Sequence, residues 1–307
     1  MGSTEGPRRA QGQYLSDPTL SIVLCTRNRA DALRRSLARY ENMAADIGWE
    51  LIVVDNGSAD ATSQVLQEFS TKTRIRVRLA AEPRAGLSRA RNAGWQCASG
   101  EIIAFTDDDC YPEPGLVTQL WRNFSESEIG YLGGRVLLYD PADFPITIQA
   151  RHTRLDIAPR SFIPAGLIQG ANMAVRREVL RAVGGFDEHL GAGTRFPSED
   201  VDFVSRVSAA GYPGAYDPRP VVFHHHRRRA PKEVNALMRS YDLGRGAYYM
   251  KCLLDPSRRF SALRSWYWSI RGRIRHGPGM VRESTLHELR GASAYLLGRL
   301  VWTIRRH

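Results

Sequence analysis

The 307-residue chain is poor in cysteine, and its cysteines are not spaced as a metal site requires. Cys25, Cys97, Cys110 and Cys252 contain no CxxC pair or other metal-type spacing. Three of them stand in apolar or strand-like surroundings. We therefore expect reduced, mostly buried thiols, as in a cytosolic protein.

Long hydrophobic runs are also missing. The first residues, "MGSTEGPRRAQGQYLSD", lack the apolar segment of a secretory signal peptide. No stretch reaches the length of a membrane span, and the apolar C-terminal segment "AYLLGRLVWTI" is broken by Arg299. We therefore expect a cytoplasmic protein. Because 43% of its residues are hydrophobic and 24% are charged, we also expect it to fold around a packed core.

Acidic residues are scarce in the last part of the chain. From Arg227 to the C-terminus there are 18 Lys and Arg residues against 5 Asp and Glu, a balance of +13. The whole chain carries +11, so the remainder is close to −2. The basic character therefore belongs to the tail, and it suits an anionic partner such as a membrane leaflet.

Strand and helix signals alternate through the first hundred residues. Apolar runs at 20–25, 50–55 and 101–105 predict buried strands, and each is separated from the next by at least one segment with helical spacing. This order predicts a mostly parallel α/β sheet. We expect a flexible tail at 1–18, a catalytic domain at 19–229 and a basic helical region at 230–307.

Three polar clusters follow predicted strands. They are Thr26-Arg27-Asn28, Asp55-Asn56 and Asp107-Asp108-Asp109. Ligands of such sheets bind at the carboxyl ends of the strands, so the clusters predict a binding site on one rim.

The three adjacent aspartates allow more than one interpretation. They could form a solvated turn, or a divalent cation such as Mg²⁺ or Mn²⁺ could cancel their mutual repulsion. An aspartyl nucleophile is disfavoured, because Thr106 precedes the cluster and Cys110 follows it.

Two downstream segments carry further chemistry. In "SED" (198–200), Ser198 is suited to cap a helix, and one of the carboxylates to act as a general base. In "VVFHHHRRR" (221–229), one histidine at the end of a strand is a candidate metal ligand.

In this order the segments resemble the family 2 glycosyltransferases of the GT-A fold. The resemblance covers about residues 20–226 and rests on "SIVLCTRNR", "LIVVDNGSAD", "PRAGLSRARNAGWQCASGEIIAFTDDD", "GANMAVRREVLRAVGGFDE", "SEDVDFVSRVSAAGY" and "VVFHHH". It implies a Rossmann-like, mostly parallel sheet flanked by helices, here with a basic helical C-terminal extension.

The resemblance also implies a role for each matching residue. Asp200 would be the catalytic base with Glu199 beside it. Asp109 would bind Mn²⁺ or Mg²⁺ together with His224 or, as the second choice, His226. The nucleotide-sugar contacts would be Thr26, Arg27, Arg29, Asp55, Arg84, Arg91, Asn92, Asp107, Asp108 and Asn172, and the acceptor contacts would be Gly185, Phe186 and Asp187.

The implied activity is metal-dependent, inverting transfer of a sugar from a nucleoside diphosphate donor, UDP first, to an acceptor hydroxyl. The acceptor would be a glycan or lipid-linked molecule of cell-envelope synthesis. Two alternatives stay open. A nucleotidyltransferase would show a Gly-rich phosphate loop, which "CTRNRAD" lacks, and a non-catalytic membrane- or polyanion-binding protein could use the same fold.

The basic tail adds "YYMKCLL" and "WYW" to its charges. It predicts either helices packed on the core or an amphipathic surface on an anionic leaflet at the inner face of the membrane. Nucleic-acid binding ranks third, since no nucleic-acid fold signature accompanies the tail.

Overall fold

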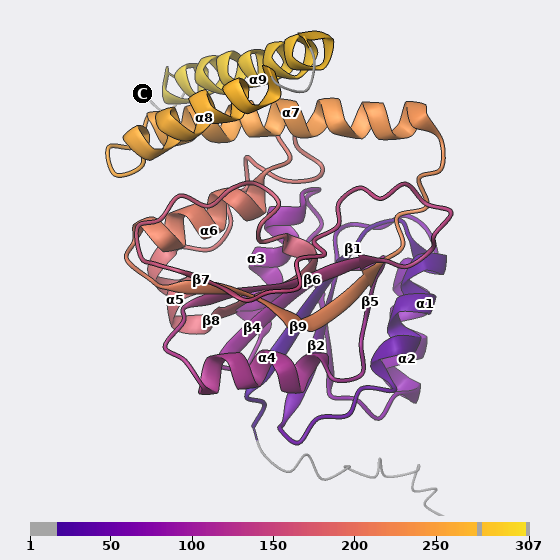
Figure 1. Ribbon diagram of the computed structural model, residues 1–307. Helices are drawn as coiled ribbons and strands as arrows, with labels where there is room; N and C mark the ends of the chain where they lie inside the picture. Colours follow the sequence, from indigo (N-terminus) through magenta and orange to yellow (C-terminus); the bar gives the residue numbers. More distant parts are fainter. Residues whose placement is uncertain (1–16, 275–277, 305–307) are drawn as a thin grey trace, which may run out of the picture.

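The computed structural model describes residues 17–274 and 278–304 (Figure 1). The predicted flexible tail, residues 1–18, lies almost entirely outside this range. Within it the strands are β1 (Leu20–Thr26), β2 (Trp49–Asp55), β3 (Val77–Ala81), β4 (Ile102–Asp107), β5 (Cys110–Pro112), β6 (Tyr131–Leu138), β7 (Leu155–Ile157), β8 (Met173–Arg176) and β9 (Gly214–His224). The helices are α1 (Ala30–Tyr40), α2 (Thr62–Lys72), α3 (Leu87–Cys97), α4 (Leu116–Ser125), η1 (Gly170–Asn172), α5 (Arg177–Val183), α6 (Glu199–Ala209), α7 (Pro231–Leu253), α8 (Arg259–Ile274) and α9 (Pro278–Ile304).

All the described strands belong to one sheet, with the order β3-β2-β1-β4-β8-β6-β9-β5 and with β7 paired to β9. The pairs β2–β3, β1–β2 and β1–β4 are parallel, as the alternation of strands and helices predicted. Strand β8 then runs antiparallel to both β4 and β6. The sheet is therefore parallel in its N-terminal half and mixed in its C-terminal half.

Both faces of the sheet are buried, which explains why its first strands are continuous apolar runs. One face packs against α1, α2 and α4 through residues such as Leu33, Val65 and Leu120. The other packs against α3, α5 and α6 through residues such as Ala90, Leu180 and Val204. The result is a three-layer α/β core whose strand ends remain free to form a site.

The C-terminal helices α7, α8 and α9 form a further layer beyond α6 (Figure 1). Gly244 and Gly246 of α7 bring the helix very close to its neighbours: a Cβ at either position would lie well under 3.0 Å from the carbonyl oxygen of Pro197 or Glu288, respectively. Asp202 of α6 is fully buried and makes ion pairs with Lys251 of α7 at 2.8 Å and Arg258 at 3.4 Å. The helical tail is thus fixed to the core by both packing and charge.

All four cysteines are free; Cys25, Cys110 and Cys252 are buried and Cys97 is exposed, as predicted for mostly buried thiols. Among the helices of residues 17–274 and 278–304, none combines the length and apolar character needed to cross a membrane.

Candidate active site

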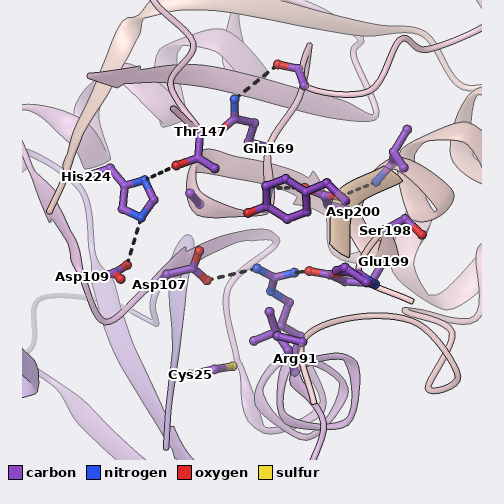
Figure 2. A pocket seen from close by; sticks show the side chains of 18 of the residues that line it. Cys25, Arg91, Asp107, Asp109, Thr147, Gln169, Ser198, Glu199, Asp200 and His224 are labelled. Carbon is purple, nitrogen blue, oxygen red and sulfur yellow. Dashed lines mark hydrogen bonds and ion pairs between the residues drawn. The ribbon is translucent and has the colours of Figure 1, made fainter. Parts of the chain in front are cut away.

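A cavity of about 900 Å³ opens at the carboxyl ends of β1 and β4 (Figure 2). The three aspartates predicted to share a site line it together with Thr26. Parallel strands place these groups side by side, since Cys25 of β1 is paired with Asp107 of β4. The cavity therefore lies where the polar strand ends predicted a binding site. Ten of the predicted residues line it: Thr26, Arg27, Arg29, Arg91, Asp107, Asp108, Asp109, Glu199, Asp200 and His224.

Asp108 and Asp109 both pair with the guanidinium of Arg29. Arg29 Nη1 donates to Asp108 Oδ1 at 2.7 Å and to Asp109 Oδ2 at 2.9 Å. Thr26 Oγ1 also donates to Asp108 Oδ2 at 2.6 Å. Burial raises the pKa of Asp108 to about 6, whereas His224 and Arg29 hold the pKa of Asp109 below its usual range despite its burial. The two neighbouring carboxylates therefore differ in their readiness to carry a charge.

Asp107 belongs to a second network, which is centred on Arg91. This side chain is 1% exposed and bridges Asp107 Oδ1 at 3.1 Å and Glu199 Oε1 at 2.7 Å (Figure 2). Burial raises the pKa of Glu199 to about 6, although Arg91 opposes this shift. Arg91 thus joins α3, β4 and the first turn of α6 beneath the cavity.

Asp200 is held by backbone groups instead of a cation. Gly170 N donates to its Oδ2 at 3.0 Å, and Val201 N donates to its Oδ1 at 2.7 Å. The side chain is half-buried and lines the cavity opposite Asp107 (Figure 2). A carboxylate that is oriented in this way and partly open to solvent can accept a proton from a bound hydroxyl.

One expectation about the same turn is wrong. Ser198 precedes α6 as the N-cap residue, but its hydroxyl makes no capping hydrogen bond. Ser198 Oγ donates to Gly244 O of α7 at 3.0 Å instead. The serine therefore ties the acidic turn to the C-terminal helices.

His224 is the histidine that faces the aspartates. Its Nε2 lies 3.4 Å from Asp109 Oδ1, and its Nδ1 lies 3.1 Å from Thr147 Oγ1 (Figure 2). His226 Nε2 lies 2.9 Å from Phe144 O, while its Nδ1 accepts from Arg228 N at 3.0 Å. Both ring nitrogens of His226 are therefore engaged outside the cavity, which favours His224 as the metal ligand.

The donor set beside His224 fits a divalent cation. Asp109, Cys110 and His224 bring one ligand atom each to within 4.8 Å of the others. Cys110 is the least suitable ligand of the three, because hard cations such as Mn²⁺ and Mg²⁺ prefer oxygen and imidazole nitrogen to a soft thiol. What remains is a carboxylate oxygen and an imidazole nitrogen, to which Mn²⁺ and Mg²⁺ can bind.

The other eight predicted residues lie outside the cavity lining. Asp55 is next to Thr26 in the sheet and accepts from Ser58 N, so it stays a prediction for the nucleotide base. Arg84 is exposed and paired with Glu82 at 3.0 Å. His226 is turned away, as described above, and the remaining five are Asn92, Asn172, Gly185, Phe186 and Asp187.

These five have structural partners. Asn92 bonds both backbone groups of Phe186, whose ring packs in the core, and a Cβ at Gly185 would collide with Asn92 Oδ1. Asn172 is 3% exposed and donates to the carbonyls of Arg135 and Pro220. Asp187 is paired with Lys251 at 2.5 Å. The structure gives these residues packing contacts and does not bring them to the cavity.

Sequence reasoning missed one wall of the cavity. The loop at 147–149, residues 164–167 and 169–171, and Met238, Tyr241 and Arg245 also line it. Burial raises the pKa of Tyr241, and Asp200 adds to the shift. No short motif marked the residues of α7, because this helix lies beyond the segments that define the site.

The fold and the arrangement of the cavity fit a glycosyltransferase, and comparisons with known proteins show the family. The model of "Glycosyl transferase family 2" matches residues 21–184, and the chain belongs to this family. This membership removes the nucleotidyltransferase alternative and makes the chain a glycosyltransferase.

Two curated relatives come from Mycobacterium tuberculosis. A pre-mycofactocin glycosyltransferase is 29% identical over 228 residues, which cover 72% of this chain and 45% of the relative. An N-acetylglucosaminyl-diphospho-decaprenol L-rhamnosyltransferase is 28% identical over 235 residues, which cover 73% of this chain and 64% of the relative. This chain thus spans between about half and two thirds of the length of these relatives.

Two solved structures share the fold. The mannosyltransferase PcManGT of Pyrobaculum calidifontis, in complex with GDP-Man and Mn²⁺, has a TM-score of 0.60 at 18% identity, covering 97% of this chain and 84% of that one. S. aureus TarS 1–349, in complex with UDP-GlcNAc, has a TM-score of 0.59 at 15% identity, and the match covers 80% of this chain and 69% of TarS 1–349. At these identities the likeness supports the fold alone.

Proposed function

We propose that this glycosyltransferase is metal-dependent and inverting, and that it moves a sugar from a nucleoside diphosphate donor to an acceptor hydroxyl. The observation that carries the proposal is the meeting of two groups in one cavity. Asp109 with His224 offers a cation site, and Asp200 offers a positioned, partly open carboxylate. A metal-assisted leaving group and a base for the acceptor are the two requirements of such a transfer.

Asp109 and His224 would hold the cation, and Thr147 would fix the imidazole by its contact with Nδ1. A bound divalent ion would neutralise the charge that develops on the departing diphosphate. Arg29 and Arg228 line the same cavity and add positive charge for the donor phosphates.

Asp200 would take the proton of the acceptor hydroxyl as that oxygen attacks. Its two backbone hydrogen bonds set its direction without a neutralising cation. Glu199 has a different duty, because it is buried against Arg91 and positions that side chain beneath Asp107. Direct attack by the acceptor oxygen opposite the leaving group inverts the sugar carbon, and this route requires no carboxylate nucleophile besides the base.

We also propose the nucleotide of the donor and the class of the acceptor. UDP is our first candidate for the nucleotide, supported by the UDP-GlcNAc complex of TarS, with GDP next because PcManGT binds GDP-Man. A glycan or lipid-linked acceptor of envelope synthesis is supported by the decaprenol-dependent relative. We further propose residues 19–229 as the catalytic domain and 230–307 as the region that completes its cavity.

The C-terminal region would also meet an anionic membrane at its inner face. Phe260, Leu263 and Tyr267 follow helical spacing on α8 and are 79%, 57% and 53% exposed. Arg259 and Arg271 on the same helix provide the complementary charge. Flotation with phosphatidylglycerol vesicles should recover the protein, and phosphatidylcholine vesicles should not. Equal recovery in both would contradict the charge argument.

A thermal-shift screen of UDP, GDP and dTDP, each with and without Mn²⁺, tests the proposed function. A ligand of the native state raises stability by mass action, so one nucleotide should give a shift that depends on Mn²⁺. The matched control is Asp109→Asn, which should abolish the metal-dependent part. The absence of any metal-dependent shift with all three nucleotides would overturn the proposal.

A further inference from the structure

A second cavity of about 490 Å³ lies between the loop around Pro164 and helices α7 and α8. It combines aromatic, basic and hydroxyl side chains, and no acidic residue is among the described residues that line it. The lining consists of Phe162, Pro164, Ala165, Arg245, Tyr249, Arg264, Ser265, Trp268 and Ser269. None of these residues is used by the proposed donor chemistry.

The second cavity adjoins the active-site cavity. Pro164, Ala165 and Arg245 line both of them. Tyr241 of α7 lines the first cavity, Arg245 one turn later lines both, and Tyr249 after a further turn lines the second. Residues four apart share one face of a helix, so this face of α7 leads from the surroundings of Asp200 into the second cavity.

The charges of the second cavity are not balanced within it. Arg264 is exposed and makes no ion pair with any residue that the structure describes. Arg245 is held by Glu288, with 2.5 Å between its Nε and Oε1, so it contributes mainly as a fixed wall. An unpaired guanidinium beside the hydroxyl-bearing Ser265 is a suitable donor set for a phosphate ester.

The aromatic side chains offer a complementary surface. Trp268 is 54% exposed, and Arg271 lies over its ring at 5.5 Å. Tyr249 is stacked on Trp266 at 5.1 Å between ring centroids, which fixes its plane. A half-open indole beside a fixed phenol ring can pack against the apolar face of a sugar ring.

We propose that the second cavity is the acceptor subsite for a sugar that carries a phosphate or diphosphate ester. Arg264 binds the phosphate, Trp268 packs against the sugar ring, and the hydroxyl to be glycosylated reaches past Arg245 towards Asp200. The proposal rests on the proposed function, because it needs Asp200 as the base. It adds the chemical class of the acceptor and assigns this class to the C-terminal helices.

The test is calorimetric titration of the full chain with glucose 1-phosphate and with methyl glucoside, with saturating UDP and Mn²⁺ filling the donor site. The phosphate ester should bind at least about tenfold more tightly than the neutral glycoside. Arg264→Gln should remove this preference, and Trp268→Ala should weaken both ligands. Arg259→Gln is the matched control, since Arg259 is exposed on the same helix and does not line the cavity.

Equal binding of the two probes, no binding of either, or equal losses in Arg264→Gln and Arg259→Gln would overturn the proposal. The UDP titration itself separates this failure from failure of the proposed function. Arg264→Gln should leave the affinity for UDP with Mn²⁺ and the melting temperature unchanged, which also shows that the variant folds.

The phosphate ester could be soluble or part of a lipid. Phosphatidylcholine vesicles that contain a polyprenyl glucosyl phosphate distinguish the two sources. If the lipid form binds more tightly than glucose 1-phosphate and still requires Arg264, the acceptor is lipid-linked. If the vesicles bind no more tightly than glucose 1-phosphate, the soluble ester is the source. If Arg264→Gln weakens neither the soluble nor the lipid-linked ester, the result contradicts the subsite.

Discussion

Gly244 of α7 connects the C-terminal helices to the catalytic turn, and Gly244→Ala tests that connection. A Cβ at Gly244 would lie well under 3.0 Å from the carbonyl oxygen of Pro197, a separation that real Cβ atoms do not show. Either α7 or the backbone at Pro197 must move. Asp200 follows Pro197 by only three residues, so we expect the displacement to reach the proposed base.

The effect on stability can be bounded. Overpacking costs about 1–3 kcal/mol, and the replacement of Gly by Ala inside a helix returns about 1 kcal/mol. The free energy of unfolding should therefore fall by at most about 2 kcal/mol, and the melting temperature by roughly 2–4 °C for each kcal/mol. Turnover should fall more than the folded fraction does, because a misplacement of about 1 Å can cost on the order of 10²-fold in rate.

Two other glycines supply the controls. Gly246→Ala would collide with the carbonyl oxygen of Glu288 in α9, away from the catalytic turn, so it should lower the melting temperature and spare turnover of the folded enzyme. A Cβ at Gly298 meets nothing within 4 Å, so Gly298→Ala should lower neither the melting temperature nor turnover. The reasoning is refuted if Gly244→Ala lowers stability while nucleoside diphosphate release per folded molecule equals that of Gly246→Ala.

Three further predictions follow from the ionised groups. Asp109→Asn should abolish Mn²⁺-dependent nucleotide binding in calorimetry, whereas His226→Gln should retain it; equal losses would contradict the choice of His224. Asp202→Asn removes a buried anion that Lys251 and Arg258 share, while Lys251 keeps Asp187 and Arg258 keeps Asp255. It should cost about 1.5–3 kcal/mol in urea unfolding, and a loss below about 1 kcal/mol would argue against a fixed tail. Burial raises the pKa of Glu199 from 4.5 to about 6, so its contribution to stability is complete below pH 4.5 and is lost as the pH rises through 6. Relative to Glu199→Gln, wild-type stability should thus fall as the pH rises over this range, and a constant difference in unfolding free energy would contradict the shift.

The first strands could be predicted because their physics is local. β1, β2 and β4 are buried on both faces, and such strands are continuous apolar runs in any sequence. β5 and β7 could not be predicted in the same way. Each has three residues and exists because it pairs with β9, which lies far along the chain. Their formation depends on the tertiary fold and leaves no pattern in the sequence.

The rim of the site was predictable for a similar reason. Parallel strands end at one edge, so the polar residues after β1 and β4 had to meet, and the structure brings them together. Motifs do not fix the direction of a side chain. Asn92 adjoins Arg91 in the sequence, yet it points to Phe186 while Arg91 points into the cavity. Tyr241 was missed because the packing of α7 over the cavity depends on contacts between distant segments, such as that of Gly244 with Pro197.

The central claim is that Asp200 removes the proton of the acceptor in a metal-dependent sugar transfer, and Asp200→Asn tests it most directly. The variant keeps the size of the side chain and loses the base. With Mn²⁺ present it should bind the nucleotide sugar as the wild type does, while nucleoside diphosphate release in the transfer assay falls by about 10²–10⁴-fold. Unchanged turnover in Asp200→Asn, with binding intact, would contradict the account.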